Sequence, residues 1–216
     1  MVYQFKITVE DVSNPTVWRR IRVPSQITFE FFSYLIVEVM GWSGYEQYAF
    51  MPNGYGKKPW ILDKEEDHHQ HKGTLEGSEE GISDYFVKPG DHMTYMYDMI
   101  FEWTHEVVLE EIDKFSIAPS AILLDGEGAC PPEYCGGAMY YEELKKILAD
   151  KNHPKFAEKK KWIIDQAFHT PNELLELEKE DVDPKTLWDP FKLDLEMAKM
   201  IFNSENINVF DDIEED

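Results

Sequence analysis

The chain has 216 residues, of which 43% are hydrophobic and 14% aromatic, enough apolar material for one sizeable core. Because these residues occur along most of the chain, wholesale disorder is excluded. Forty-three acidic residues against 21 basic ones give a formal net charge of −22, so the chain repels a phosphate backbone and direct, nonspecific nucleic-acid binding is disfavoured.

The cysteines and the hydropathy pattern bear on the compartment. Cys130 and Cys135 are five positions apart and cannot build the disulfide framework of a small secreted protein. Residues 1–10 alternate apolar and polar side chains, unlike a signal peptide, and no stretch approaches the ~18 consecutive apolar residues of a membrane span. We therefore expect a cytoplasmic protein with no membrane partner.

The first forty residues predict a hairpin followed by a helix. Tyr3–Glu10 alternates apolar and polar residues, and Val17–Val23 follows the turn at residues 13–15, so the two segments should pair as antiparallel strands. Thr28 is a suitable N-cap and Gly41 a suitable left-handed C-cap. Between them runs an apolar stripe at helical spacing: Phe32, Leu35, Ile36, Val39 and Met40.

Two acidic segments are expected to lie outside the packed elements. Residues 62–84 contain eight acidic residues around His68, His69 and His71. This composition indicates a solvated loop, and no apolar residues among the histidines would hold a metal-binding geometry. Residues 206–216, with five acids among the last six, predict a disordered tail after a single domain over residues 1–205.

The remaining pattern changes from strands to helices. Strand signals cover residues 46–51, 84–87, 92–99 and 102–110, and helical signals cover residues 140–148, 154–168, 171–179 and 193–202. A loop over residues 125–137 separates the two sets. The order predicts an α+β fold, with a mainly antiparallel sheet, one early packed helix and a C-terminal helical segment.

Several segments carry a resemblance to a known family. The alternating residues Tyr3, Phe5 and Ile7 are followed by Pro15-x-Val17-Trp18-Arg19-Arg20-Ile21-x-Val23-Pro24 and by Met40-Gly41-Trp42. Later come Tyr97-Asp98, Trp103-x-His105-x-Val107-x-Leu109-Glu110 and Asp125-Gly126-Glu127-Gly128-Ala129-Cys130-Pro131-Pro132-Glu133-x-Cys135-Gly136-Gly137. These segments resemble the plasmid pRiA4b ORF-3-like family over roughly residues 3–168.

The resemblance implies an association with plasmids and transposable elements, without an established biochemical activity. The family's central hairpin usually reads Tyr-Asp-Phe-Gly-Asp-x-Trp-x-His, whereas here its middle positions are Met99, Ile100, Phe101 and Glu102. Glu46 and Tyr48 stand where the family commonly has a histidine pair. A site built from those histidines is therefore not expected in this chain.

The loop over residues 125–137 is the first candidate for chemistry. Asp125, Glu127 and Glu133 are hard oxygen ligands that suit Mg²⁺ or Ca²⁺, and Asp98 or Glu102 of the hairpin could complete the set. The alternative is that these carboxylates cap turns by accepting hydrogen bonds from backbone N–H groups. Both interpretations stay open at the sequence level.

The two cysteines are a second candidate metal site. A Cys-x₄-Cys spacing can bring Cys130 and Cys135 to one zinc ion, but a closed site needs four ligands. The missing pair would be histidines such as His105 or His153, or carboxylates of the hairpin. A divalent metal is therefore one hypothesis for this loop.

Arginine and tryptophan residues are candidates for ligand binding. Arg19 and Arg20 are successive strand residues and point to opposite faces, so one of them is expected to be partly buried. It would pair with a carboxylate such as Asp98, or bind a phosphate or carboxylate ligand. Trp103, with Glu133 of the loop, would line a ligand pocket or belong to the core.

Two functional hypotheses follow. The first is a non-enzymatic binding or accessory protein of a mobile element or its host, which engages a protein or small ligand in preference to nucleic acid. The alternative is a metal-dependent hydrolase or nucleotide-processing enzyme, in which the loop and hairpin carboxylates hold the metal and His105 or Asp98 performs catalysis. The enzyme hypothesis requires those carboxylates to converge in one cleft.

Overall fold

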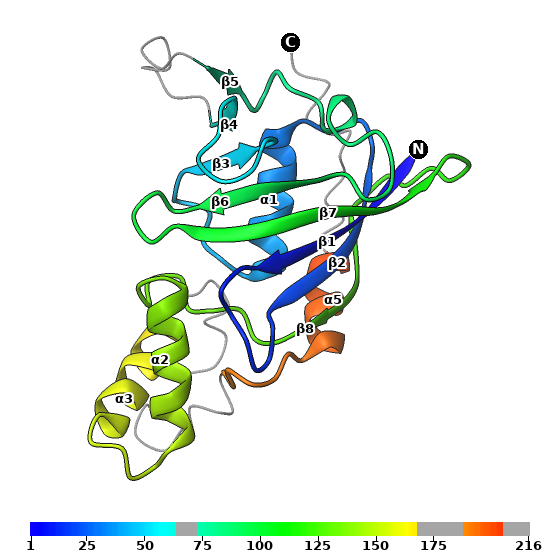
Figure 1. Ribbon diagram of the computed structural model, residues 1–216. Helices are drawn as coiled ribbons and strands as arrows, with labels where there is room; N and C mark the ends of the chain where they lie inside the picture. The colour runs from blue at the N-terminus through cyan, green and yellow to red at the C-terminus, as the bar shows by residue number, and fades with distance from the viewer. Residues whose placement is uncertain (64–72, 168–187, 205–216) are drawn as a thin grey trace.

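An eight-stranded, mostly antiparallel sheet forms the centre of the molecule in a computed structural model that describes residues 1–63, 73–167 and 188–204 (Figure 1). Its strands are β1 (Val2–Val9), β2 (Trp18–Pro24), β3 (Tyr48–Met51), β4 (Trp60–Leu62), β5 (Thr74–Glu76), β6 (His92–Tyr97), β7 (Trp103–Asp113) and β8 (Ile122–Glu127). They lie in the order β5-β4-β3-β6-β7-β1-β2-β8, and only β4 and β5 pair in parallel. The predicted α+β class is confirmed.

The predicted β1–β2 hairpin lies inside this sheet. β1 pairs with β2 from Val2↔Pro24 to Thr8↔Trp18, and β7 pairs with its other side. The odd-numbered residues Phe5, Ile7 and Ile21 are fully buried, as the alternation predicted. The even-numbered neighbours of β1 and β2 therefore point to the opposite face.

Helix α1 (Phe29–Met40) packs across the buried face of the sheet (Figure 1). Both predicted caps are confirmed: Thr28 Oγ1 accepts a hydrogen bond from the Phe31 N–H group, and Gly41 adopts φ 79°. Phe32 of the helix packs on Phe5 of β1, with ring centroids 4.7 Å apart. The core is thus an aromatic layer between α1 and the sheet.

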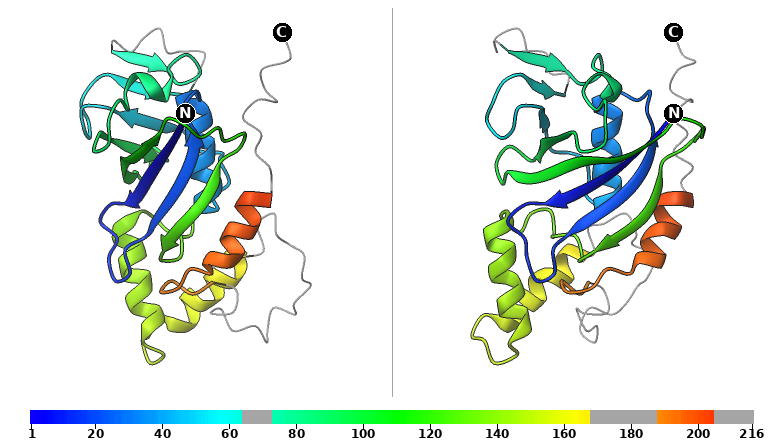
Figure 2. Two further views of the ribbon diagram at one scale, coloured as in Figure 1. Left: turned by 90° about the vertical axis from the view of Figure 1, so that its right-hand side faces the viewer. Right: turned by 45° about the vertical axis from the view of Figure 1, so that its right-hand side comes forward.

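The later helices lie at one end of the sheet and along one edge (Figure 2). They are α2 (Ala138–Ala149), α3 (Phe156–Ala167) and α5 (Leu195–Ser204). α2 holds the β1–β2 turn, because the buried ammonium of Lys145 donates to the Ser13 carbonyl and lies 2.7 Å from Glu142. α5 lies beside the edge strand β8, and the Leu123 N–H group donates to Asn203 Oδ1 at 2.8 Å.

Some element predictions were wrong. Residues 84–87 are not a strand: a 3₁₀ turn spans Ile82–Asp84, and the Phe86 N–H group bonds the Ile82 carbonyl four residues earlier. Part of the predicted 62–84 loop is strand β5. Asp125–Glu127 belong to β8 rather than to a loop, because Gly126 lets the strand approach β2 so closely that a Cβ atom there would lie 2.9 Å from the Trp18 carbonyl oxygen.

Other predictions fall on residues that the structure does not describe. The helix expected over residues 171–179 and the tail over residues 206–216 lie outside the described residues, as do His68, His69 and His71. Within the described part of the chain, no helix is long and apolar enough to cross a membrane.

Candidate functional site

The segment that follows β8 is held through its backbone carbonyl groups. Arg19 Nη1 donates to the carbonyls of Glu127 and Gly128, both at 3.0 Å. Four aromatic side chains donate to the carbonyls that follow. The Tyr141 hydroxyl donates to the Ala129 carbonyl (3.1 Å), and the Trp188 indole N–H group donates to the Cys130 carbonyl (3.0 Å). The indole N–H groups of Trp42 and Trp103 donate to the carbonyls of Pro131 (3.0 Å) and Glu133 (3.3 Å), respectively. These bonds fix the backbone path of residues 127–133.

Arg19 is the buried arginine of the pair, with 2% of its surface exposed. Besides the two loop carbonyls, it donates to the carbonyls of Trp18 (2.9 Å) and Val39 (3.3 Å). Burial lowers the pKa of its guanidinium below the ordinary value. The expected partner Asp98 does not contact it: the Asp98 carboxylate accepts from the N–H groups of Ile100 and Phe101.

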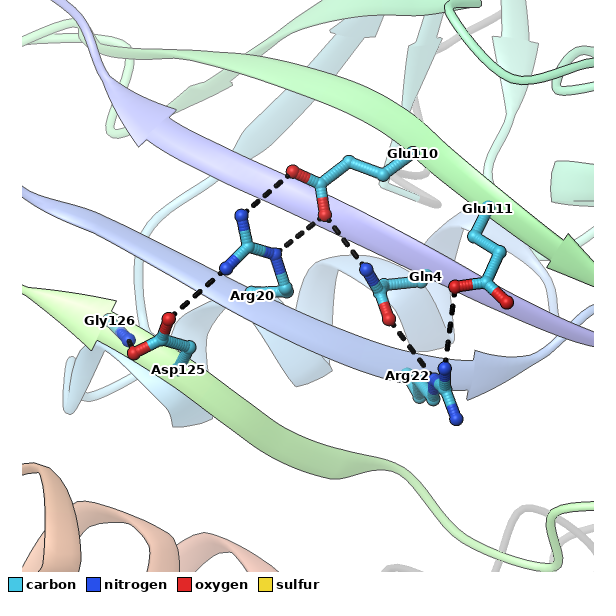
Figure 3. Close-up of polar contacts among 7 residues, drawn as sticks. All are labelled: Gln4, Arg20, Arg22, Glu110, Glu111, Asp125 and Gly126. Atoms are coloured by element: carbon cyan, nitrogen blue, oxygen red, sulfur yellow. Dashed lines mark hydrogen bonds and ion pairs between the residues drawn. The ribbon is translucent and has the colours of Figure 1, made fainter.

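Arg20 points to the face of the sheet opposite α1, which we call the open face, and forms ion pairs there with two carboxylates (Figure 3). Its Nε and Nη2 atoms donate to the two carboxylate oxygens of Glu110 at 2.6 and 3.0 Å, and its Nη1 atom donates to Asp125 at 3.2 Å. Gln4 extends the network from Glu110 to Arg22. The hydrogen bonds from Arg20 lower the pKa of Glu110, so this arginine is engaged by protein carboxylates.

Glu133 ties the loop to the region after α1. Its carboxylate accepts from the hydroxyl of Tyr97 (2.6 Å) and from the N–H and hydroxyl groups of Ser43 (2.9 and 2.8 Å). The Tyr97 ring stacks on the Trp42 ring, with 5.0 Å between the ring centroids, and the centroids of the Trp42 and Trp103 rings are 5.8 Å apart. Trp103 is fully buried, so this predicted ligand-binding residue is part of the aromatic layer beneath the loop.

Four carboxylates gather where this loop meets the β6–β7 turn, and we call this region the acidic end: Glu46, Asp98, Glu102 and Glu133. Burial and the charges of Asp98 and Glu133 raise the pKa of Glu46. No lysine or arginine in the described ranges forms an ion pair with any of the four. The acidic end is therefore a concentration of negative charge without a protein counterion in that part of the chain.

Apolar side chains are exposed beside these carboxylates. The exposed fraction is 88% for Tyr45, 80% for Ile100, 54% for Tyr55 and 48% for Tyr134. The Tyr55 hydroxyl donates to Glu102 at 3.0 Å. Sequence reasoning missed Tyr45, Tyr55 and Ile100, since single apolar residues in loops carry no periodic signal.

The structure separates two of the predicted metal ligands, Asp125 and Glu127, from the other three. Asp125 pairs with Arg20, and Glu127 accepts from the Trp18 indole N–H group at 3.2 Å, away from the partners of Asp98, Glu102 and Glu133. Across residues 1–63, 73–167 and 188–204, no three His, Cys, Asp or Glu side chains are grouped to hold a metal. In the described part of the chain, these five carboxylates have no hydrogen-bond partner in common.

The cysteines and His105 are embedded in protein. Cys130 and Cys135 are free thiols, and burial raises both pKa values, that of Cys135 to about 12. His105 is fully buried between Trp42 and Tyr95, and its ring nitrogens form no hydrogen bond of good geometry with the described groups, although backbone groups of Tyr95 and Trp103 act on the ring. Burial lowers the pKa of His105 to about 4, so the ring is neutral at physiological pH.

Comparisons with known proteins agree with this architecture. The chain is 28% identical over 162 residues to the uncharacterized protein y4hQ of Sinorhizobium fredii, covering 74% of this chain and 80% of that protein. The crystal structure of the protein of unknown function MM3350 from Methanosarcina mazei Go1 superposes with a TM-score of 0.64 at 27% identity, covering 86% of this chain and 96% of that one. The family model described as plasmid pRiA4b ORF-3-like protein matches residues 1–179, and the chain therefore belongs to this family.

Proposed function

We propose that the protein is a non-enzymatic binding protein whose acidic end receives a segment of a partner protein rich in lysine and arginine. One observation carries the proposal: Glu46, Asp98, Glu102 and Glu133 gather without a protein cation in the described ranges, next to exposed Tyr and Ile side chains. A surface that combines negative charge with exposed apolar rings complements a basic segment.

The backbone beneath this surface supports recognition. The indole and hydroxyl donors of the aromatic layer fix residues 127–133, and Glu133 is held by Ser43 and Tyr97. A surface that is already ordered loses little conformational entropy when a partner docks. The net charge of −22 favours the same class of partner and opposes nucleic acid. A cytoplasmic location and a link to mobile elements complete the proposal, the link resting on the family's plasmid-derived description.

The test is a fluorescence-anisotropy titration of the full chain with a labelled oligolysine peptide. The double variant Glu46→Gln/Glu102→Gln removes two charges from the acidic end. The control Glu79→Gln/Glu106→Gln removes two charges from exposed positions elsewhere. We expect a dissociation constant about tenfold higher for the first variant and little change for the control.

Salt gives a second check on the same titration. Because the attraction is between opposite charges, raising the salt concentration should weaken wild-type binding more than binding by Glu46→Gln/Glu102→Gln. Equal weakening of binding by both double variants would mean that the peptide responds only to total charge. That result would overturn the proposal.

A further inference from the structure

A pocket of about 240 Å³ lies between α2, α3 and the end of the loop, outside the acidic end. Figure 1 shows α2 and α3 side by side below the sheet. Tyr134 contributes to its wall from the loop, Tyr140 from α2 and Trp162 from α3. This volume lies just below the about 300–1,000 Å³ of sites for drug-sized ligands, which suits a small ligand of one or two rings.

The lining of the pocket is mainly aromatic and aliphatic. Leu144 and Ile147 are buried residues on the same face of α2, and they line the pocket together with the three aromatic residues. Tyr134 and Tyr140 keep 48% and 56% of their surface exposed, so their rings are available to a bound molecule. A planar ring would pack against these faces.

The charge inside the pocket is opposite to that of the chain. Lys155 directly precedes α3, and Lys159 lies one helical turn later on the same side. The positive end of the α3 dipole lies at the same place. Glu143 is the one acidic residue that lines the pocket.

Neither lysine is strongly neutralised by a neighbour. Lys159 lies 3.6 Å from its sequence neighbour Glu158, whose side chain is 69% exposed and does not line the pocket. Lys155 has no ion pair with any described residue. Two lysines on one side of an aromatic pocket define an anion-binding pole in a protein of net charge −22.

We propose that this pocket binds a small planar aromatic anion, with the ring between Tyr134, Tyr140 and Trp162 and the carboxylate or phosphate group at Lys155 and Lys159. Cys135 also lines the pocket. Burial raises the pKa of this thiol to about 12, so Cys135 adds no negative charge to the pocket. The inference does not rest on the proposed function, since Tyr134 is the one residue common to both and the pocket takes a ligand of opposite charge.

The experiment is a titration of the full chain by saturation-transfer NMR with benzoate and phenyl phosphate as probes. Benzamidine, a cationic analogue of the same shape, is the charge control, and acetate is the control for the ring. We expect saturable binding of at least one aromatic anion and none of benzamidine or acetate. The two anionic probes distinguish a carboxylate ligand from a phosphate ligand.

Variants then locate the site. Lys155→Gln and Lys159→Gln should each weaken binding of the anion about tenfold, whereas Lys161→Gln, an exposed lysine of α3 that does not line the pocket, should leave it unchanged. Melting temperatures of all three variants establish that they are folded. The proposal is overturned if no aromatic anion binds saturably, if benzamidine binds equally well, or if Lys161→Gln weakens binding as much as the pocket variants.

Discussion

Arg19 and Arg20 are neighbours on β2 but lie on opposite faces of the sheet, and their hydrogen-bond partners differ in kind. On the covered face, Arg19 is buried and its positive charge is met by the carbonyl oxygens of four residues. On the open face, Arg20 is met by the carboxylates of Glu110 and Asp125 (Figure 3). Arg19 thus acts as a structural clamp on the loop, while Arg20 links strands β7 and β8 through charge.

This comparison separates two kinds of polar interaction. Carbonyls fixed by the backbone cannot titrate, so the Arg19 contacts are independent of pH over the range where the fold is stable. Carboxylates can be protonated and are screened by salt. The Arg19 contacts should therefore respond to changes in shape and packing, and the Arg20 contacts to changes in pH and ionic strength.

The largest effect is expected at Trp103, on the covered face. Trp103→Ala removes a fully buried indole and the hydrogen bond to the Glu133 carbonyl, and should lower the free energy of unfolding by about 3–5 kcal/mol. Trp18, which lies on the open face near the side chains of Lys6 and Arg20, is the matched control. Urea denaturation of Trp18→Ala should show a loss of about 1 kcal/mol, and equal losses would remove the distinction between the faces.

His105 gives the covered face a pH response of its own. Its pKa is about 4 in the folded protein against an ordinary value of 6.5, so the unfolded chain binds a proton more readily. The contribution to stability is complete above pH 6.5 and is lost as the pH falls towards 4, by about 3 kcal/mol in total.

The variant His105→Phe keeps an aromatic ring and removes the titration. Its free energy of unfolding, measured by urea denaturation across this range, should vary less with pH than that of the wild type. The difference in slope is the readout, so a constant change from repacking does not affect the result. Parallel pH profiles for the two proteins would contradict the buried, neutral state of His105.

The direct comparison of the arginines is expected to give a smaller effect. Arg19→Met removes the hydrogen bonds to the buried carbonyls of Val39 and Gly128 and should cost about 2 kcal/mol. Arg20→Met removes a partly exposed ion pair and should cost about 1 kcal/mol. Only the Arg20 interaction should weaken at high salt. Thermal unfolding of both variants at low and high salt checks the order, and a salt-dependent loss for Arg19→Met would contradict it.

The smallest effect concerns Glu110, whose pKa is lowered by its hydrogen bonds from Arg20. A carboxylate with a lowered folded pKa stabilises the protein above its ordinary value of 4.5, and this stability is lost as the pH falls through the folded pKa. Glu110→Gln should therefore be less stable than the wild type by up to about 1 kcal/mol at neutral pH. The difference should shrink in acid, and a difference that grew there would show that the pair does not act through charge.

Sequence reasoning worked where a local rule decides the structure. Alternation predicted the β1–β2 hairpin and the opposite faces of Arg19 and Arg20, and the caps at Thr28 and Gly41 bounded α1. It failed where the partner is distant in sequence. The carboxylate that pairs with Arg20 is Glu110 of β7, which reaches it across β1, and nothing near either residue signals that contact.

The loop shows the same limit. Its composition of acidic residues, cysteines and glycines suggested ligands, but its structural partners are the indole N–H groups of Trp42, Trp103 and Trp188 together with Arg19. These tryptophans are far apart in the sequence, so their indole N–H donors produce no spacing pattern that could be recognised. The exposed residues Tyr45, Tyr55 and Ile100 beside the acidic end come from separate loops. Their proximity is therefore evident only from the three-dimensional structure.

The most direct measurement is an NMR titration of ¹⁵N-labelled protein with the oligolysine peptide. The acidic-end proposal predicts saturable chemical-shift changes confined to residues 43–47, 98–102 and 133–134. These changes should be reduced in Glu46→Gln/Glu102→Gln and retained in Glu79→Gln/Glu106→Gln. Changes centred on the open face around Glu110, or spread evenly over the acidic surface, would contradict it.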